Sequence, residues 1–289
     1  MNDDADNRFL VFLLAFFLLV AGLFSAGNFK SNGIIRLEDI QAMQAERSLA
    51  GLALEAKAVS VYDFTANKKI YGGGDELPLA MASLAKSMTV TLALNVLGED
   101  GAVRISKEAV SQSGDFGLTV GESWRAGELA KLTLIASAND GAYALAEAAG
   151  GNFLDKMNEK TRKIGMEHAV FLSVTGLDEL EEGVPVLASG FASASDLNTL
   201  AYYALRSHPE VFTATTSEGA YGFQNTNPAA GKIPNLLFSK TGFTDLAGGN
   251  LSIIFKNRDE HIIAVTILGS SYEGRFSDME KIVSVLYSE

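Results

Sequence analysis

The stretch Leu236–Gly269, LLFSKTGFTDLAGGNLSIIFKNRDEHIIAVTILG, decides the fold of this chain. It contains three apolar runs, LLFSKTGF, NLSIIFK and HIIAVTILG, and a turn at Asn257-Arg258-Asp259 separates the last two. Apolar and β-branched runs of this length, bounded by turn residues, are typical of β-strands. The sequence therefore predicts a set of adjacent strands in the C-terminal third of the chain.

A second strand region lies near the start of the domain. The run AVSVYDF, a turn at residues 65–68 and the run KKIYGGG predict a β-hairpin. The glycines at 72–74 are not followed by Lys-Ser or Lys-Thr, so we expect a flexible turn there and not a phosphate-binding loop.

Helical patterns fill the middle of the chain and its end. They cover Ala82–Leu97 before Gly98, Glu128–Ala149 before Gly150, Phe153–Ile164, Ser195–Leu205 and Arg275–Tyr287. Strands at both ends with helices between them indicate one α+β domain. We expect the first and last strands to share an antiparallel sheet flanked by helices, with a helical subdomain inserted between them.

Composition narrows the function. The 289 residues carry a net charge of −12 with a pI near 4.8, which argues against nucleic acid as a partner. Because the chain has no cysteine, disulfides and zinc–thiolate sites are excluded. We expect neither a metal nor a cofactor.

The N-terminus predicts a membrane segment. Residues 9–29 carry no charge and would span about 30 Å as a helix. The preceding residues, MNDDADNR, are acidic, unlike a signal peptide, so we expect a retained anchor; cleavage near Ser25-Ala26-Gly27 is the alternative. The anchor and linker would occupy residues 1–33, and the catalytic domain 34–289, beginning with a short helix over Ile34–Leu49. Arg8 on one side and Lys30 and Arg36 on the other do not fix the orientation.

Ser83-Leu84-Ala85-Lys86 supplies a nucleophile and a base. Residues three apart share one helix face, so the Lys86 ammonium can reach the Ser83 hydroxyl. Lysine serves as a base only where burial or a second cation lowers its pKa. Met81, Leu84 and Met88 would bury it, and Lys240 would be the second cation. The alternative is a helix-capping serine beside an exposed lysine.

Two more motifs complete the set. Ser137 and Asn139 interrupt an alanine-rich helical stretch. They could simply form a local cap or kink. In the functional alternative, Ser137 relays a proton to the leaving amine, and Asn139 orients Lys86 and the substrate amide. Lys240-Thr241-Gly242 lies on a predicted strand, where Lys240 and Thr241 point to opposite faces and need a twist or bulge to share a pocket. Gly242 would let a substrate backbone lie close to the strand.

Other catalytic arrangements are not evident. The sequence contains neither G-x-S-x-G nor H-E-x-x-H, and His168, His208 and His261 lack metal-ligand spacing. We interpret them as surface residues, and Glu181-Glu182 as part of a solvated loop.

The ordered trio resembles the serine-type D-Ala-D-Ala carboxypeptidases, the low-molecular-mass penicillin-binding proteins of peptidase family S11. The resemblance runs from about Ala56 to Leu286 and includes SANDGAYALAE, MNEKTRKIGM, TGLD, SASDLNTLA and KTGFTDLAGGNL. It implies a β-lactamase/transpeptidase-like fold, an acyl-enzyme on Ser83, and Lys86 as its base. The implied pocket also contains Ser137, Asn139, Lys240, Thr241 and Gly242, with Thr244 at the substrate carboxylate and the N–H groups of Ser83 and Phe243 as the oxyanion hole.

The chain departs from that family at three places. Some members have a basic residue where Thr226 stands, which leaves strict selectivity for a terminal carboxylate open. The segment before Lys240 lacks an expected glycine. Many members continue into a β-rich domain and a C-terminal anchor, and since this sequence ends at Glu289 we expect attachment through the N-terminal helix.

The resemblance implies a D-Ala-D-Ala carboxypeptidase that acts on peptidoglycan stem peptides outside the cytoplasm and is covalently inhibited by β-lactams. A class A-like β-lactamase is the second reading, although the E-x-x-L-N acid is missing. A DD-endopeptidase and a non-catalytic penicillin-binding scaffold are the further alternatives.

Overall fold

The computed structural model describes residues 37–114 and 116–288. Contacts divide the chain into two units, Met1–Ile40 and Gln41–Glu289. Of the first unit only residues 37–40 are described, as the first turn of α2 (Leu37–Ala50). The predicted anchor at 9–29 and its linker lie outside the described residues. Within the described ranges, every helix is too short or too polar to cross a membrane.

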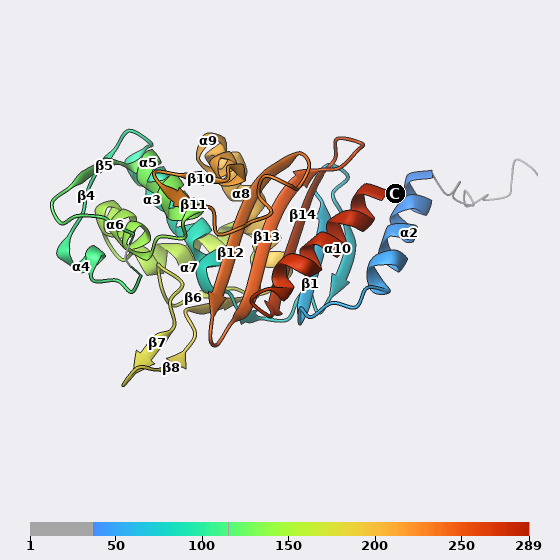
Figure 1. Cartoon of the computed structure of the whole chain (residues 1–289), viewed down its shortest axis with the longest axis horizontal. Coiled ribbons are helices and arrows are strands. Elements are labelled where there is room, and N and C mark those ends of the chain that lie inside the picture. Colours follow the sequence, from blue (N-terminus) through green and yellow to red (C-terminus); the bar gives the residue numbers. More distant parts are fainter. Residues whose placement is uncertain (1–36, 115, 289) are drawn as a thin grey trace, which may run out of the picture. The chain divides into compact units, whose positions relative to one another are not determined.

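A five-stranded antiparallel sheet forms the centre of the second unit, in the order β12-β13-β14-β1-β2 (Figure 1). The strands are β1 (Ala58–Asp63), β2 (Lys68–Gly73), β12 (Leu236–Thr244), β13 (Gly248–Lys256) and β14 (Ile262–Ser270). Since β1 pairs with β14, Val61 opposite Val265, the first and last strands share one sheet, as predicted. β12 is an edge strand, because within this sheet it pairs with β13 alone.

Both faces of the sheet are covered, which explains why its strands are apolar throughout. One face packs Val61, Ile253 and Val265 against Leu49 of α2 and against α10 (Gly274–Ser288). Ala264 and Leu268 belong to the larger core on the other face, which α8 (Ala194–Ser207) contributes to. The capping box between Ser193 and Asp196 begins α8 by pairing its first free N–H groups.

The remaining helices form the inserted subdomain around α3 (Figure 1). They are η1 (Ala82–Ala85), α3 (Lys86–Leu97), α4 (Lys107–Val110), α5 (Ala126–Ile135), α6 (Asn139–Ala149), α7 (Phe153–Ile164), α9 (Pro209–Thr213) and η2 (Ala214–Thr216). The short strands are β3 (Leu79–Ala80), β4 (Ala102–Arg104), β5 (Ser123–Arg125), β6 (Val170–Phe171), β7 (Glu179–Glu181), β8 (Val184–Leu187), β9 (Gly190–Ala192), β10 (Gly219–Ala220) and β11 (Phe223–Gln224).

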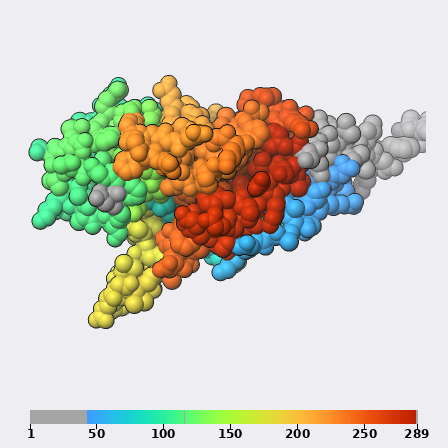
Figure 2. Space-filling view, in the orientation of Figure 1, coloured from blue at the N-terminus to red at the C-terminus, as the bar shows by residue number. Residues whose placement is uncertain are grey.

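Several predicted elements need correction. The helix predicted over 128–149 is two helices, because Ser137 has a φ of +60° and breaks the hydrogen-bond ladder. The glycines at 72 and 73 belong to β2, and only Gly74, with a φ of +62°, turns the chain. Glu181 belongs to the exposed hairpin β7–β8, which projects from the surface in Figure 2, and not to a loop. The helix predicted over 153–164 is confirmed.

Candidate active site

Ser83 and Lys86 form the centre of the candidate site. Ser83 lies in the 3-10 turn η1, and Lys86 is the first residue of α3. Their side chains lie on one side of this segment, with 2.9 Å between Lys86 Nζ and Ser83 Oγ. The predicted pairing is confirmed, although the α-helix begins at Lys86 and not at Ser83.

Two further oxygens fix the Lys86 amine. Its Nζ lies 2.7 Å from Asn139 Oδ1 and 2.5 Å from the Thr175 carbonyl oxygen. Asn139 Nδ2 donates to the Ser113 carbonyl at 2.6 Å, so its amide oxygen must face Lys86. Asn139 therefore contacts the lysine, as its predicted role requires, while the contacts of Thr175 and Ser113 emerge only from the structure.

Three oxygens surround the Lys86 amine, so an ammonium can donate to all three, whereas a neutral amine donates to two and accepts from the third. A neutral lysine has two N–H donors and one lone pair, and Asn139 Oδ1 and the Thr175 carbonyl can only accept. Both N–H groups are therefore committed to them, and the lone pair faces Ser83 Oγ. In that state the serine hydroxyl donates to Lys86, which is the arrangement that activates a serine nucleophile.

Burial tunes the base. Lys86 is fully buried, and Met81, Leu84 and Met88 are buried around it, as predicted. Loss of hydration lowers the pKa of Lys86 from 10.5 to about 7, while the charge of Asp140 opposes the shift. Burial, the first predicted cause, is therefore what lowers the Lys86 pKa, and repulsion from Lys240, the second, is not. That repulsion instead acts on Lys240.

Lys240 and Ser137 form the second pair. Lys240 Nζ donates to Ser137 Oγ at 2.9 Å and to the Thr241 carbonyl at 2.9 Å. Its third N–H has no partner among the described residues and is free for an anion. Burial, with the nearby charges of Lys86 and Arg275, lowers the pKa of Lys240 well below 10.5. An anionic substrate would oppose this shift and favour the ammonium.

Thr241 reaches a different neighbour. Its hydroxyl lies 2.6 Å from the hydroxyl of Thr226, and the pairing of β12 with β13 is regular from Phe238 to Thr244. No bulge therefore brings Lys240 and Thr241 together. Thr244 Oγ1 accepts from the Ala247 N–H at 3.2 Å in the β12–β13 turn, so its predicted contact with substrate stays a prediction.

The edge strand β12 runs directly beside the nucleophile. A Cβ added to Gly242 would lie 3.1 Å from the Met81 carbonyl oxygen and 3.3 Å from the Ser83 nitrogen, so a side chain here would crowd η1. Behind the strand, Arg275 of α10 donates to the Gly242 carbonyl at 2.8 Å, and its guanidinium lies 5.9 Å from the centre of the exposed Phe243 ring. Arg275 thus holds the segment that carries the predicted oxyanion donor of Phe243.

Two of the seven described non-glycine residues with a positive φ lie at this site. Ala82 has a φ of +48° and Ser137 a φ of +60°, conformations that residues with a Cβ rarely adopt. Gly176, with a φ of +84°, packs so closely on η1 that a Cβ would lie 2.4 Å from the Ala82 carbonyl oxygen. The loop that carries the Thr175 carbonyl is thereby locked against the nucleophile turn.

Two of the histidines interpreted as surface residues are in fact anchored. His261 Nδ1 lies 2.6 Å from Asp63 Oδ2 and links the β1–β2 and β13–β14 turns. His208 is partly buried, and its Nε2 lies 3.0 Å from Asn95 Oδ1. In the part of the chain that the structure describes, no three His, Asp or Glu side chains are grouped for a metal.

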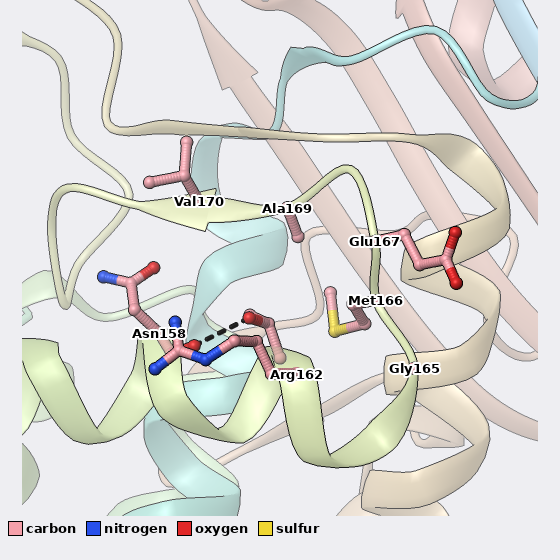
Figure 3. Close-up of a pocket in the computed structure, with 8 residues that line it drawn as sticks. Asn158, Arg162, Gly165, Met166, Glu167, Ala169 and Val170 are labelled. Carbon is pink, nitrogen blue, oxygen red and sulfur yellow. Dashed lines mark hydrogen bonds between the residues drawn. The ribbon is translucent and has the colours of Figure 1, made fainter.

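A separate hollow of about 390 Å³ lies between α7 and β6 (Figure 3). It is lined by Asn158, Thr161, Arg162, Gly165, Met166, Glu167, Ala169 and Val170. Thr161 Oγ1 donates to the Asn158 carbonyl at 2.8 Å. None of these residues belongs to the three motifs, so the hollow is distinct from the candidate active site.

Comparisons with known proteins point to one family. Residues 42–271 match the model of the family Peptidase S11, described as D-alanyl-D-alanine carboxypeptidase. The D-alanyl-D-alanine carboxypeptidase DacF of Bacillus subtilis is 29% identical over 86% of this chain and 66% of its own length. A D-alanyl-D-alanine endopeptidase of Haemophilus influenzae is 28% identical over 78% of this chain and 81% of its own.

A solved structure is also similar. Penicillin-binding protein D2 of Listeria monocytogenes, in its ampicillin-bound form, superposes with a TM-score of 0.71 and 29% identity, covering 82% of this chain and 99% of that one. The fold expectation, transpeptidase-like with mixed helix and antiparallel sheet, is confirmed. This chain spans 66% and 64% of the lengths of DacF and of the Escherichia coli carboxypeptidase DacC, just under two thirds.

Proposed function

The chain belongs to the Peptidase S11 family of D-alanyl-D-alanine carboxypeptidases, and from this we propose that it is a serine peptidase that cleaves the D-Ala-D-Ala bond of peptidoglycan stem peptides. The observation that carries the proposal is the contact between Ser83 Oγ and a buried Lys86 whose amine is held by Asn139 and Thr175. The reaction proceeds through an ester on Ser83 and needs no metal or cofactor.

Acylation uses the pairs already described. The substrate backbone lies along the free edge of β12, and its carboxylate meets the unpaired N–H of Lys240. Neutral Lys86 takes the proton of Ser83, whose oxygen attacks the carbonyl carbon of the penultimate D-Ala. The N–H groups of Ser83 and Phe243 stabilise the oxyanion. Ser137 then relays a proton to the departing amine, and free D-alanine leaves.

The rate of deacylation distinguishes the proposed peptidase from a β-lactamase. The described hydrogen-bond partners of Ser83, Lys86 and Ser137 include no carboxylate. Water must therefore be activated by the same lysine, which a bulky penicilloyl group hinders. We expect the penicillin ester to persist and the cephalosporin nitrocefin to turn over slowly.

Covalent labelling tests the nucleophile. Fluorescent penicillin is incubated with residues 34–289, and intact mass shows whether one adduct forms on Ser83. The proposal requires an adduct with the native chain and none with Ser83→Ala. Release of D-alanine from a peptide that ends in D-Ala-D-Ala excludes the scaffold alternative, because a dead site binds penicillin without releasing product.

The location of the domain is part of the proposal. Stem peptides lie outside the cytoplasmic membrane, so the catalytic domain acts there and residues 9–29 anchor it. Fusion of a reporter enzyme that folds only outside the cytoplasm to residue 289 tests this orientation, and an inactive fusion would refute it. Extraction with detergent but not with high salt would distinguish the anchor from a cleaved signal.

A further inference from the structure

A second hollow, of about 470 Å³, lies where α7, α8 and the turn after β1 meet. It shares no residue with the three motifs or with the hollow in Figure 3. Its volume falls in the range typical of small-molecule sites and is large enough for a sugar unit. The residues that line it are Phe64, Lys163, Ile164, Thr199, Tyr202, Tyr203, Arg206 and Ser207.

Aromatic rings make up much of this lining. Phe64 and Tyr202 are stacked, with 3.9 Å between their ring centres and 13° between their planes. Phe64, Tyr202 and Ile164 pack against the larger core but are only partly buried, so they still present apolar surface to the hollow. The face of an aromatic ring is negative, and the C–H groups on one side of a sugar ring are weakly positive, so such rings suit a sugar.

Two cations lie at the edges of these rings. Arg206 donates to the Tyr202 hydroxyl at 3.4 Å, and its guanidinium carbon lies 5.7 Å from the centre of that ring. Lys160 Nζ donates to the Tyr203 hydroxyl at 3.0 Å and lies 5.0 Å from that ring centre. Among the described residues, neither cation is ion-paired with a carboxylate. Both are therefore available to an anion.

The charge of the hollow is opposite to that of the whole chain. Lys163 also lines it, and its only ion-pair partner among the described residues is Glu159, at 3.7 Å in an exposed pair of the kind that contributes little. The described lining includes no Asp or Glu, although the chain has a net charge of −12. The hollow therefore combines apolar rings with positive charge, which favours a ligand that has both a sugar-like face and an anionic group.

We propose that this hollow binds a sugar unit of the peptidoglycan glycan strand that carries a free carboxylate. The sugar ring packs on Phe64 and Tyr202, and Arg206 binds the carboxylate. Stem peptides are attached to the strand through such carboxylates, so a sugar that has lost its stem peptide presents one. The choice of this glycan rests on the proposed function, whereas the hollow itself does not involve Ser83. Binding here holds the domain on a strand whose remaining stem peptides are its substrates.

Calorimetric titration of the full chain tests the ligand class. The first probe is a peptide-free oligosaccharide of alternating N-acetylglucosamine and N-acetylmuramic acid, and the second is an N-acetylglucosamine oligomer of the same length, which has no carboxylate. We expect the first to bind about tenfold more tightly, because only it forms a hydrogen bond between charged groups. A glycerol phosphate oligomer supplies charge without a sugar ring, and it should bind more weakly than the first probe.

Two variants separate the ring from the charge. Tyr202→Ala should weaken both glycans about tenfold, and Tyr202→Leu repeats the test if the alanine variant does not fold. Arg206→Gln should weaken only the carboxylated glycan, again about tenfold. Arg258→Gln is the matched control, because it removes the same charge from an exposed position in the turn between β13 and β14. It should change either affinity by less than about threefold.

The two proposals fail on different results. Absence of binding of the carboxylated glycan at millimolar concentration, unchanged affinity in Arg206→Gln and Tyr202→Ala, or tighter binding of the glycerol phosphate oligomer would each overturn this inference. Ser83→Ala should bind the glycan as the native chain does, and Arg206→Gln should be acylated by penicillin at the native rate. Failure of penicillin to acylate Ser83 would overturn the proposed function and leave the glycan titration unaffected.

Discussion

The pH dependence of acylation follows from the state of Lys86. Only the neutral amine can accept the Ser83 proton, and burial lowers the pKa of Lys86 to about 7. At pH 7 about half of the chains then carry a neutral base, whereas a lysine at its ordinary pKa would be neutral in roughly one chain in three thousand. Burial therefore contributes on the order of a thousandfold to the acylation rate at neutral pH.

The direction of this pH dependence can be measured from the acylation rate as a function of pH. Below pH 7 the amine is protonated, so the limiting acylation rate should fall about tenfold for each pH unit and level off above the pKa. Stopped-flow measurement with saturating fluorescent penicillin gives this rate. Saturation matters because the charge of Lys240 acts on binding of the carboxylate.

Asp140→Asn is the companion variant. The Asp140 charge raises the pKa of Lys86 against the effect of burial, so its removal should move the inflection to lower pH. An inflection near 10 in the native chain would show that Lys86 is not buried as described. A shift to higher pH in Asp140→Asn would refute the electrostatic reasoning.

Three further predictions concern a close glycine contact, a buried amide and the lifetime of the penicillin adduct. Gly176→Ala places a Cβ 2.4 Å from the Ala82 carbonyl oxygen at a φ of +84°, and should cost about 3 kcal/mol or more of unfolding free energy in urea melts. Gly165→Ala, with a φ of +80° and open space, should cost only about 1 kcal/mol; equal losses would contradict the packing argument. Asn198→Ala removes buried bonds to Ser60 and Thr266, and should lower stability by about 2–4 kcal/mol while acylation of the folded fraction persists. The penicillin adduct should survive for many catalytic cycles of peptide hydrolysis, and rapid return of free enzyme in mass spectra would instead support a β-lactamase.

The strands and long helices could be predicted because each has a local pattern. The three C-terminal runs are apolar on both sides, and both faces of their sheet are covered by helices. The split of the helix predicted over 128–149 was harder, since alanine-rich sequence continues across Ser137. Only tertiary contacts, above all that of Ser137 with Lys240, stabilise the left-handed conformation there.

The candidate site was predictable only where a side chain carries the chemistry. Ser83, Lys86, Ser137, Asn139 and Lys240 have side chains of recognisable chemistry at recognisable spacing. The Thr175 and Ser113 carbonyl groups act through the backbone, which every residue possesses. A glycine beside Thr175 was the one signal available, because close packing requires it.

Arg275 shows why the rest of the candidate site could not be predicted from the sequence. In the sequence it begins a helix, and Glu273 and Asp278 are the nearest residues of opposite charge in the chain. In the fold it is 3% exposed and holds the Gly242 carbonyl from behind β12. A buried guanidinium is costly to desolvate unless its N–H groups are bound. Its position therefore joins α10 to the motif strand, and we expect loss of this contact to move the Gly242–Phe243 backbone, which carries one of the predicted oxyanion donors, relative to Ser83.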